Sequence, residues 1–507
     1  MNAMPTPASV RPPAGACAKL RVVSDASTSP RAGRAAPANG ARPEALTGSD
    51  LVTLTGGRLL RDSLRPIRGG AVDSRLVRPG ELFVALPGER TDGHRYLREA
   101  VVAGAAALIV ASEPDPATLA TLGDVTIVVL SDPLAGLQAI AAAWRARFRP
   151  LVVAVTGSIA KTSTKEAIAT VLASSGKTLR SEGNQNNEIG VPLTLLRLGA
   201  DDVNAVLEMG MYTSGEIAHL ARLARPQIAV VTSVLGVHLS RIGTIDAVER
   251  AKFELIEALP TDGIAVLNAD DVRVRRMAGR TAVRAVTYGF AADADVGAER
   301  VRSRGTAGMR FRLRLATHTG TERVAASIPT LGRLSVHNAL AGAAVGLAAG
   351  MAPDAIAAAL DAGWSAPHRG QLLAAGGVTI VDDSYNASPA SMIAALQMLA
   401  DLPGRRIAVL GEMLELGEGA SAGHRDVGIA AASTCALLVT VGEGAAALAA
   451  GAREAGLDAA AVIETRDRAG ALAVLRERLV RGDVVLVKAS RGLELDLLAD
   501  DLLAGLA

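Results

Sequence analysis

Residues 151–166, LVVAVTGSIAKTSTKE, join an apolar run, a short loop and a Lys-Thr pair that opens a helical pattern. This order of elements suits a phosphate-binding site, because the loop offers free backbone N–H groups and the positive end of a helix dipole to an anion. Lys161 could reach terminal phosphates, and the Thr162 hydroxyl could bind Mg²⁺. The common form of the motif, Gly-x-x-x-x-Gly-Lys-Ser/Thr, fails at both glycines, where Val155 and Ala160 stand.

Taken alone, this loop has two interpretations. One is a nucleotide site. The other is an ordinary strand-to-helix turn with a solvated Lys161 and with Thr162 as the helix cap, because the glycines that make the motif specific are missing. The rest of the chain has to decide between them.

The elements that would position the loop are apolar strands alternating with helices. Apolar runs that end in Gly, Asp, Asn or Ser and are separated by helices indicate parallel sheets. In such sheets ligands bind beyond the carboxyl ends of the strands. After the loop, Ile168, Val171 and Leu172 have helical spacing, and the helix should end near Gly176. The strand candidates are 82–86, 107–110, 151–157, 204–210, 227–234, 263–270, 377–386, 405–413, 436–444 and 483–490.

A chain of 507 residues predicts about three domains. We expect an α/β fold in three domains: a small N-terminal α/β domain at 48–149, a central parallel-sheet domain like that of P-loop ATPases at 150–365, and a Rossmann-like C-terminal domain at 366–507. Residues 1–47, rich in Ala, Pro, Ser, Gly and Arg, read as a disordered leader.

Composition argues against several classes of protein. A net charge of +2 and an aromatic content of 2% argue against nucleic-acid binding. Cys17 and Cys435 are too few for a disulfide framework or a thiolate metal site. The apolar stretches at 101–111 and 339–352 fall short of the roughly 18 residues of a membrane span, and residues 1–47 lack the apolar core of a signal peptide. We therefore expect a cytoplasmic protein with no membrane span.

Ten further motifs, taken in their order along the chain, resemble the Mur ligase family. The resemblance covers about 48–495, and DDSYNA and GEMLELG are most similar to the member that adds D-alanyl-D-alanine. The phosphate loop of this family reads T-G-x-x-G-K-T/S, so Gly157 is its first glycine and only Ala160 departs from it. The motifs are GNQNNEIGVP (183–192), EMGMYTSGEI (208–217), VHLSRIGT (237–244), AKFELIEALP (251–260), LNADD (267–271), GRLSVHNALAGAA (332–344), APHRG (366–370), VDDSYNASPASM (381–392), VLGEMLELG (409–417) and VKASRG (487–492).

The resemblance implies an ATP-dependent amide ligase of peptidoglycan precursor synthesis. ATP would phosphorylate the terminal carboxylate of UDP-N-acetylmuramoyl-tripeptide, and the amine of D-alanyl-D-alanine would attack the acyl phosphate through a tetrahedral intermediate. It further implies two Mg²⁺ ions and a monomeric enzyme. The N-terminal domain would bind the UDP-sugar, the central domain ATP, and the C-terminal domain would complete the ligase site.

The same resemblance assigns roles to single residues. The ATP-binding set is Thr156, Gly157, Ser158, Ile159, Ala160, Lys161, Thr162, Asn268, Asn338, Arg369 and Asp383. The metal set is Thr162, Glu208, His238 and Lys252, and the catalytic set is Lys161, His238, Lys252 and Arg369. The substrate set is Ser74, Arg75, His94, Asn184, Asn186, Asn187, Tyr385, Asn386 and Pro389. Lys252 matches a lysine that the family carbamylates.

Several of these residues have plainer interpretations when the resemblance is set aside. Glu208 would be a solvated carboxylate at a strand end, and His238 a structural histidine. Lys252 would be a surface lysine paired with a nearby Glu on its helix. Asn268 and Asn338 would serve in turns or caps.

Four positions depart from the family pattern: Ala160, Leu334 with Ser335, Ser388 and Ala489. Ala160 matters most. If its position requires a positive φ, the Cβ costs on the order of 1–2 kcal/mol. Expressed at the transition state, that energy would lower the rate about ten- to thirtyfold. If the position is helical, alanine costs little.

Two alternatives stand beside the leading function. The first is a sister ligase that adds diaminopimelate or lysine, or a folylpolyglutamate synthase; DDSYNAS and the missing Asp-Asn-Pro-Arg motif argue against it. The second is a paralogue without turnover that binds nucleotide-sugar or partner proteins, suggested by Ala160, Leu334 and Ala489. The retained phosphate and metal residues argue against it.

Overall fold

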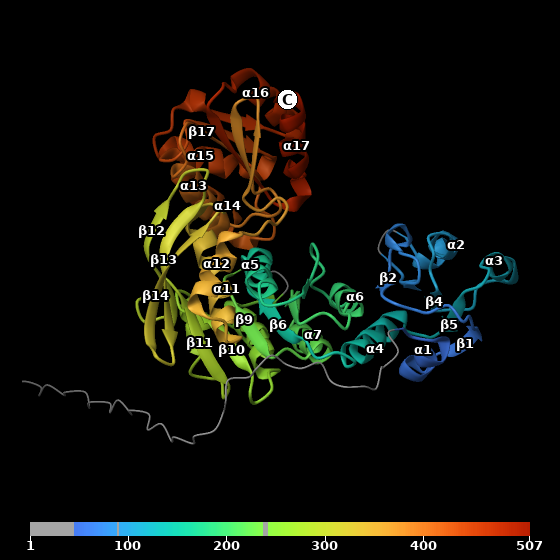
Figure 1. Ribbon diagram of the computed structural model, residues 1–507. Helices are drawn as coiled ribbons and strands as arrows, with labels where there is room; N and C mark the ends of the chain where they lie inside the picture. The colour runs from blue at the N-terminus through green and yellow to red at the C-terminus, as the bar shows by residue number, and fades with distance from the viewer. Residues whose placement is uncertain (1–44, 89–90, 237–241, 507) are drawn as a thin grey trace, which may run out of the picture. The chain divides into compact units, whose positions relative to one another are not determined.

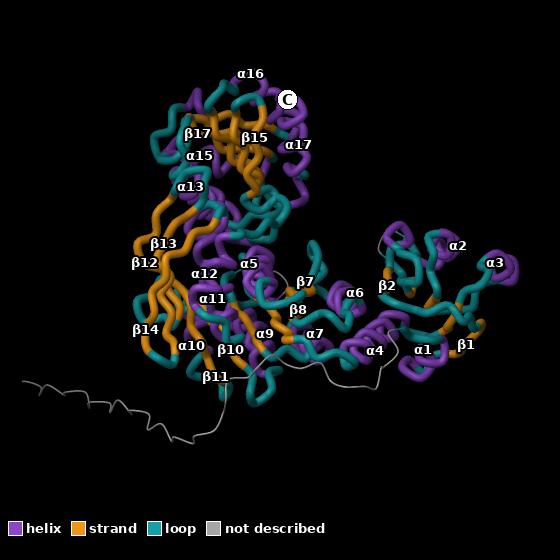
Figure 2. Tube along the Cα trace, in the orientation of Figure 1, coloured by secondary structure: helices purple, strands orange, loops and turns teal. Residues whose placement is uncertain are grey.

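The computed structural model describes residues 45–88, 91–236 and 242–506, and their secondary structure contains three β-sheets that follow one another along the chain (Figures 1 and 2). Leu46 is 3% exposed and pairs with Ile67, while Thr47 caps the first helix. The last residues of the expected leader therefore belong to the first domain, because Leu46 contributes to its core. Residues 1–44 of that leader lie outside the described residues.

The first sheet has five strands in the order β1-β5-β4-β3-β2. Strands β2 to β5 run parallel, and β1 is antiparallel to β5. Consecutive residues of β4, such as Leu108 and Ile109, belong to two different hydrophobic clusters, so both faces of the sheet are covered. The elements are α1 (Gly48–Thr55), β1 (Arg58–Arg61), β2 (Gly70–Ala71), η1 (Ser74–Leu76), β3 (Leu82–Val84), η2 (Gly93–Tyr96), α2 (Leu97–Val102), β4 (Ala107–Val110), α3 (Pro116–Thr121), β5 (Thr126–Val129) and α4 (Pro133–Arg145).

The second sheet has nine strands in the order β14-β13-β12-β11-β10-β9-β6-β8-β7. Its strands are β6 (Leu151–Thr156), β7 (Thr178–Arg180), β8 (Asn204–Glu208), β9 (Ile228–Val231), β10 (Ile264–Asn268), β11 (Arg284–Gly289), β12 (Val296–Ser303), β13 (Met309–Thr317) and β14 (Gly320–Ile328). Its helices are α5 (Lys161–Ala173), α6 (Gly190–Leu196), α7 (Glu216–Ala224), α9 (Ile245–Glu257), α10 (Val272–Met277), α11 (Gly332–Ala348) and α12 (Pro353–Asp361).

Strand β6 lies inside this sheet, with β8 on one side and β9 on the other, both parallel to it. Val152 and Ala154 of β6 join the cluster that contains α7 and α9, whereas Val153 and Val155 join the cluster beneath α5, α11 and α12. After β6 the chain crosses to the edge strand β7. It then returns to form β8 on one side of β6 and β9 on the other. The loop after β6 therefore lies at a topological switch point, where ligands of open α/β sheets bind.

The expectation of parallel sheets holds for β6 to β12 but misses an antiparallel extension. Strands β12, β13 and β14 pair antiparallel and run side by side (Figure 2). Residues 309–315, MRFRLRL, alternate buried apolar side chains with arginines, which is the pattern of a strand covered on one face only.

The third sheet has six strands in the order β15-β16-β20-β17-β18-β19, all parallel except the edge strand β15. Helices α13 and α14 cover one face and α16 and α17 the other. The elements are β15 (Gln371–Ala375), β16 (Val378–Asp382), α13 (Pro389–Ala400), β17 (Arg405–Gly411), η3 (Gly417–Gly419), α14 (Ala420–Ala432), β18 (Leu437–Val441), η4 (Glu443–Ala445), α15 (Ala446–Glu454), η5 (Ala459–Ala461), β19 (Val462–Thr465), α16 (Arg468–Arg478), β20 (Asp483–Lys488), η6 (Arg491–Leu493) and α17 (Leu495–Leu506).

No helix in the described ranges is both long enough and apolar enough to cross a membrane.

Candidate active site

The loop between β6 and α5 is held by the segment that follows β9. The Ser158 amide donates to the Ser233 carbonyl at 2.9 Å, and the Ile159 amide donates to the Ser233 hydroxyl at 3.1 Å. The Thr232 hydroxyl donates to the Ile159 carbonyl at 2.7 Å. Gly157 has φ +152°, and a Cβ there would lie 1.8 Å from Thr232 Oγ1. Only glycine therefore allows the loop to approach its support this closely.

Ala160 is the N-cap residue of α5 and has φ +63° and ψ 5°, in the left-handed region. The position is thus not helical, which resolves the alternative left open by the sequence. A left-handed alanine costs on the order of 1–2 kcal/mol relative to its preferred backbone. The rest of the loop accepts this strain: the Ala160 carbonyl still accepts the Thr164 amide at 2.9 Å.

Replacing Ala160 by glycine should relieve this strain. We expect Ala160→Gly to leave kcat/KM for ATP unchanged or to raise it by up to about thirtyfold, because at most about 2 kcal/mol would be expressed at the transition state. Steady-state kinetics measure the change. Ala173→Gly is the matched control, because Ala173 is an exposed helical residue of α5, where glycine should lower stability by about 1 kcal/mol without affecting ATP. A fall in kcat/KM for Ala160→Gly would show that the alanine methyl is useful.

Glu208 closes β8 beside the phosphate loop and is 2% exposed. The Thr162 hydroxyl donates to its Oε2 at 2.8 Å, and the Asn186 amide donates to its Oε1 at 2.8 Å. Glu208 is therefore a buried, oriented carboxylate rather than a solvated one. Hydroxyl and carboxylate oxygens at one point are the ligands that a hard cation such as Mg²⁺ prefers.

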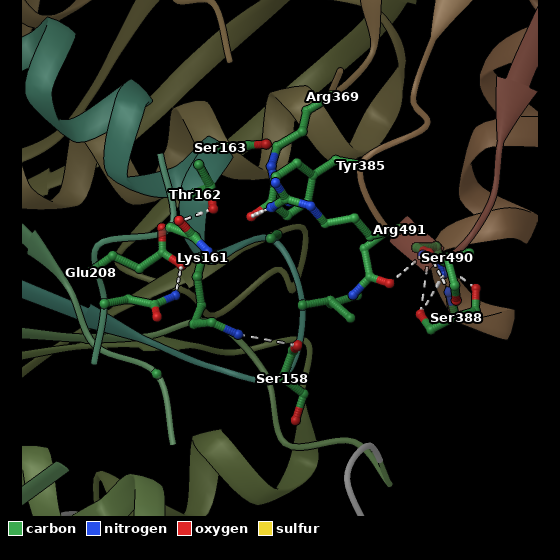
Figure 3. A pocket seen from close by; sticks show the side chains of 18 of the residues that line it. Ser158, Lys161, Thr162, Ser163, Glu208, Arg369, Tyr385, Ser388, Ser490 and Arg491 are labelled. Carbon is green, nitrogen blue, oxygen red and sulfur yellow. Dashed lines mark hydrogen bonds between the residues drawn. The ribbon is translucent and has the colours of Figure 1, made fainter. Parts of the chain in front are cut away.

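Lys161 curls back over the loop, and its Nζ donates to the Gly157 carbonyl at 2.8 Å. Figure 3 shows the same amine directed at Ser158, whose carbonyl oxygen lies 3.5 Å away. Burial lowers the pKa of Lys161, while the charge of Glu208 acts in the opposite direction and that of Arg369 adds to the lowering. The ammonium thus lies at the mouth of the loop, between one carboxylate and a second cation. A strongly anionic ligand would restore the balance of charge there.

Lys252, on α9, is 3% exposed, so it is not a surface lysine. Burial, and then the nearby charge of Lys161, hold the pKa of Lys252 well below its ordinary value. Within the described residues no carboxylate forms an ion pair with it. His238, the other residue expected at this point, lies outside the described residues.

A cleft of about 750 Å³ joins the phosphate loop to the third sheet's strand ends, and its size is typical of ligand sites. Fourteen of the residues expected to bind ATP, metal or substrate line it: Ser158, Ile159, Ala160, Lys161, Thr162, Asn184, Asn186, Asn187, Glu208, Asn338, Arg369, Asp383, Tyr385 and Asn386. Residues from β6, β8 and the chain after β16 thus meet in one cavity, as expected from strand ends.

The wall from the C-terminal domain is built on Tyr385. The Arg369 guanidinium lies over its ring at 4.0 Å from the centroid, and Arg491 donates to its hydroxyl at 3.1 Å (Figure 3). Next to it, Asp383 forms an ion pair of 2.7 Å with Lys488. Stacking and hydrogen bonding therefore hold two guanidinium groups at the cleft.

The remaining expected residues of the second and third sheets support the cleft without lining it. Thr156 and Gly157 lie buried or beneath the loop. Asn268 donates to the Thr232 carbonyl at 2.6 Å and accepts from the Asp270 amide at 2.9 Å, so it anchors the chain that holds the phosphate loop. Pro389 is the first residue of α13, following the cap Ser388. Lys252 also lies outside the cleft lining.

Two residues that line the cleft also have structural duties. Asn187 Oδ1 accepts the Gly190 amide at 2.9 Å at the start of α6. Asn338 accepts from the Thr164 hydroxyl at 3.0 Å and so connects α11 to α5. Asn187 therefore supports the start of α6. Asn338, for which a turn or cap role was the plainer interpretation, instead connects two helices behind the loop.

Residues expected to bind UDP lie in the first domain and do not line this cleft. Asp73 caps η1 through the Arg75 amide and pairs with the Arg75 guanidinium at 2.6 Å. Ser74 is the first residue of that turn. Both ring nitrogens of His94 are engaged: Nδ1 with Asp92 at 2.6 Å, and Nε2 with the Ala111 amide at 2.8 Å.

Several residues that line the cleft were given no role from the sequence, among them Ser163, Lys488 and Arg491. Lys488 and Arg491 lie in the VKASRG motif at the end of β20, so the strand-end rule applied to them as well as to Asp383. Of the departures from the family pattern, Ser388 is the N-cap of α13, and its hydroxyl accepts the Ser391 amide. Ala489 is buried, with its Cβ close to Gly411.

Among the described residues, no group of three or more His, Cys, Asp or Glu side chains is arranged to hold a metal ion. Thr162 and Glu208 supply oxygen atoms, but a complete Mg²⁺ site needs further oxygen ligands from elsewhere, such as phosphate or water.

Comparison with known proteins identifies three matching family models: the Mur ligase family catalytic domain at residues 66–174, the Mur ligase middle domain at 155–346, and the glutamate ligase domain at 368–491. UDP-N-acetylmuramoyl-tripeptide–D-alanyl-D-alanine ligase of Mycobacterium tuberculosis is 39% identical over 469 residues, which cover 85% of this chain and 91% of that one. The crystal structure of MurF from Acinetobacter baumannii superimposes with a TM-score of 0.79 at 28% identity, over 91% of this chain and 99% of that one. MurF from Thermotoga maritima, solved in complex with ADP, gives 0.72 at 26% identity, over 87% and 98%.

Proposed function

This chain belongs to the Mur ligase family, and from that membership we propose how its cleft makes an amide bond. The protein is an ATP-dependent ligase that joins D-alanyl-D-alanine to UDP-N-acetylmuramoyl-tripeptide in peptidoglycan precursor synthesis. The observation that supports the assignment of its site most directly is the meeting of Lys161, Thr162 and Glu208 with Arg369 and Tyr385 in one cleft.

In the proposed mechanism, the N-terminus of α5 binds the phosphates of ATP, whereas the Ser158 and Ile159 amides of the preceding loop already donate to Ser233 and hold the loop in place. Lys161 and Arg369 neutralise charge on the transferring phosphoryl group, as their positions at the loop and across the cleft allow. The carboxylate of the tripeptide attacks the γ-phosphorus, the bond to ADP breaks, and an acyl phosphate forms. Asn268 and Asn338 act indirectly, by holding the loop and α5 in place.

Thr162 and Glu208 fit a Mg²⁺ ion, because their oxygen atoms already converge at 2.8 Å. We place a second ion near Glu208, with His238 and a carbamylated Lys252 as ligands. Bound Mg²⁺ would neutralise phosphate charge and keep ATP and the acceptor carboxylate in line. Lys252 suits carbamylation because it is buried and its lowered pKa favours the neutral amine. The Nζ lone pair bonds to the carbon of CO₂, one proton leaves the nitrogen, and the product is an anion.

Each domain has a proposed task. The domain at 48–149 binds the UDP-sugar through the segments that contain Ser74, Arg75 and His94. The domain at 150–365 binds ATP, with Asn184, Asn186 and Asn187 facing the muramoyl peptide. The domain at 366–507 binds the dipeptide. The amine of the dipeptide attacks the acyl carbon, and the tetrahedral intermediate then collapses and releases phosphate. We further propose a cytoplasmic monomer.

A substrate panel tests this function. Purified protein with ATP, Mg²⁺ and UDP-N-acetylmuramoyl-tripeptide should release phosphate rapidly with D-alanyl-D-alanine and at least about a hundredfold more slowly with D-alanine, lysine or diaminopimelate. The tripeptide should be supplied with lysine and with diaminopimelate as its third residue. Preference for a single amino acid would indicate a sister ligase. Absence of ADP formation with every acceptor would indicate a binding paralogue.

A further inference from the structure

The C-terminal wall of the cleft carries a guanidinium group, that of Arg491, for which the phosphoryl chemistry has no use. We propose that Arg491 binds the terminal carboxylate of the incoming dipeptide and that Tyr385 positions its guanidinium. The inference rests on the proposed ligase function and identifies the residue that recognises the acyl acceptor.

The charges of the cleft single out Arg491. Among the described residues, the other lysines and arginines that line the cleft are Lys161, Arg369 and Lys488. Lys161 lies on the phosphate loop, and the charge of Lys488 is neutralised by Asp383 at 2.7 Å. Arg369 is assigned to the phosphates. Arg491 forms no ion pair with any residue that the structure describes and donates instead to the neutral Tyr385 hydroxyl.

The position of Arg491 is fixed by its backbone and by one ring. Arg491 follows Ser490, whose amide donates to the Glu412 carbonyl at 3.0 Å and whose hydroxyl accepts the Leu414 amide at 2.9 Å. Its guanidinium carbon lies 5.1 Å from the Tyr385 centroid, and Figure 3 shows the side chain reaching toward that ring. An arginine held this way loses less conformational entropy when it binds an anion.

Apolar groups also line the cleft, and one of them, Leu414, lies close to Gly492, the residue that follows Arg491. Leu414 is 47% exposed, although it is a large apolar side chain, and a Cβ on Gly492 would lie only 3.3 Å from its Cδ1. Ala394 and Ala395 line the same cleft. A cation beside small apolar groups suits a carboxylate that is flanked by methyl side chains.

The two guanidinium groups lie around the same ring, that of Tyr385. Those of Arg369 and Arg491 lie 4.0 and 5.1 Å from the same centroid, so their carbons are separated by at most the sum of these distances. Two extended residues span about 7 Å. A dipeptide whose amine faces the acyl phosphate near Arg369 can place its carboxylate against Arg491, because the two guanidinium groups border the same ring.

The test compares D-alanyl-D-alanine with its C-terminal amide, which keeps the amine and both methyl groups but lacks the charge. The parent should use the amide with kcat/KM lower by about 10- to 100-fold, as expected for loss of a charged bidentate hydrogen bond. Arg491→Met should lower kcat/KM for the acid to the level of the amide and leave that for the amide and the KM for ATP unchanged. Arg491→Lys should keep part of the preference for the acid.

Tyr385→Phe tests the positioning role, because it keeps the ring and removes the hydroxyl that accepts from Arg491. It should raise KM for the acid several-fold at nearly constant kcat and reduce the preference for acid over amide. Arg466→Met is the matched control, since Arg466 is an exposed arginine of the same domain that does not line the cleft. Thermal unfolding of every variant checks the fold.

Equal losses with acid and amide in both Arg491 variants, or a raised KM for ATP, would overturn the assignment. Ligation by the parent without discrimination between acid and amide would also overturn it, while leaving the ligase function intact. A parent that ligates neither dipeptide would instead contradict the proposed function itself.

Discussion

Lys161→Met is expected to lower kcat for ligation by roughly 10²- to 10³-fold, the usual effect of removing one preorganised charge from a transition state. The Lys161 ammonium lies 2.8 Å from the Gly157 carbonyl, at the mouth of the loop that would hold the transferring phosphate. Methionine keeps the apolar stem and removes the charge. ADP release under saturating ATP measures the effect.

Lys177→Met is the control for this substitution, because Lys177 is an exposed lysine outside the cleft and pairs only at 3.5 Å with Asp202. It should change kcat by less than twofold. Thermal unfolding should be little altered in Lys161→Met, since the variant replaces a partly buried charge by an apolar group. A kcat within threefold of the parent would remove Lys161 from the phosphate-binding site and return the loop to its simpler interpretation as a turn.

The phosphate loop itself was predictable from sequence down to its elements. A buried strand, a loop of four residues and a helix starting at Lys161 occur as the pattern of 151–173 indicates. The backbone of Ala160 was not predictable, because alanine is compatible with a helical position. Its φ is positive, and the preceding residue, Ile159, donates to Ser233 on the chain after β9, which lies more than seventy residues away.

The burial of Lys252 was also not predictable from the sequence. Sequence places it in AKFELIEALP, where a lysine between apolar residues could face either solvent or core. Packing of α9 against the central sheet decides the matter: Lys252 is buried together with Ala251 and Leu255. Local pattern gives the period of a helix, but the depth of one side chain depends on what the helix packs against.

The rule that ligands bind beyond the carboxyl ends of parallel strands predicts much of the cleft lining. It was not applied to every strand. It pointed to Glu208 at the end of β8 and to Asp383 after β16, and both line the cleft. The same rule applies to β20, which ends at Lys488 and is followed by Arg491. Both lie in the VKASRG motif, but neither was predicted to have a role in the site.

The proposed carbamylation of Lys252 leads to the second prediction with a large expected effect. Lys252→Ala is expected to lower kcat by roughly 10²- to 10³-fold, because it removes an anion from the proposed metal site. Added acetate or formate should restore part of the activity in this variant by supplying a carboxylate to the space that the side chain leaves. Lys252→Arg should be as impaired as Lys252→Ala and should not respond, since it fills that space with a permanent cation.

The modification itself can be observed apart from activity. With ¹³C-labelled bicarbonate, the parent should show a carbamate carbon signal by NMR that Lys252→Arg lacks. Removal of dissolved CO₂ should lower activity reversibly in the parent and leave the variants unaffected. An unmodified amine in the parent, together with full activity of Lys252→Arg, would contradict the proposal. The proposal rests on charge: burial and the charge of Lys161 disfavour the ammonium form of Lys252, whereas a carbamate would neutralise Lys161 and add oxygen ligands for the metal.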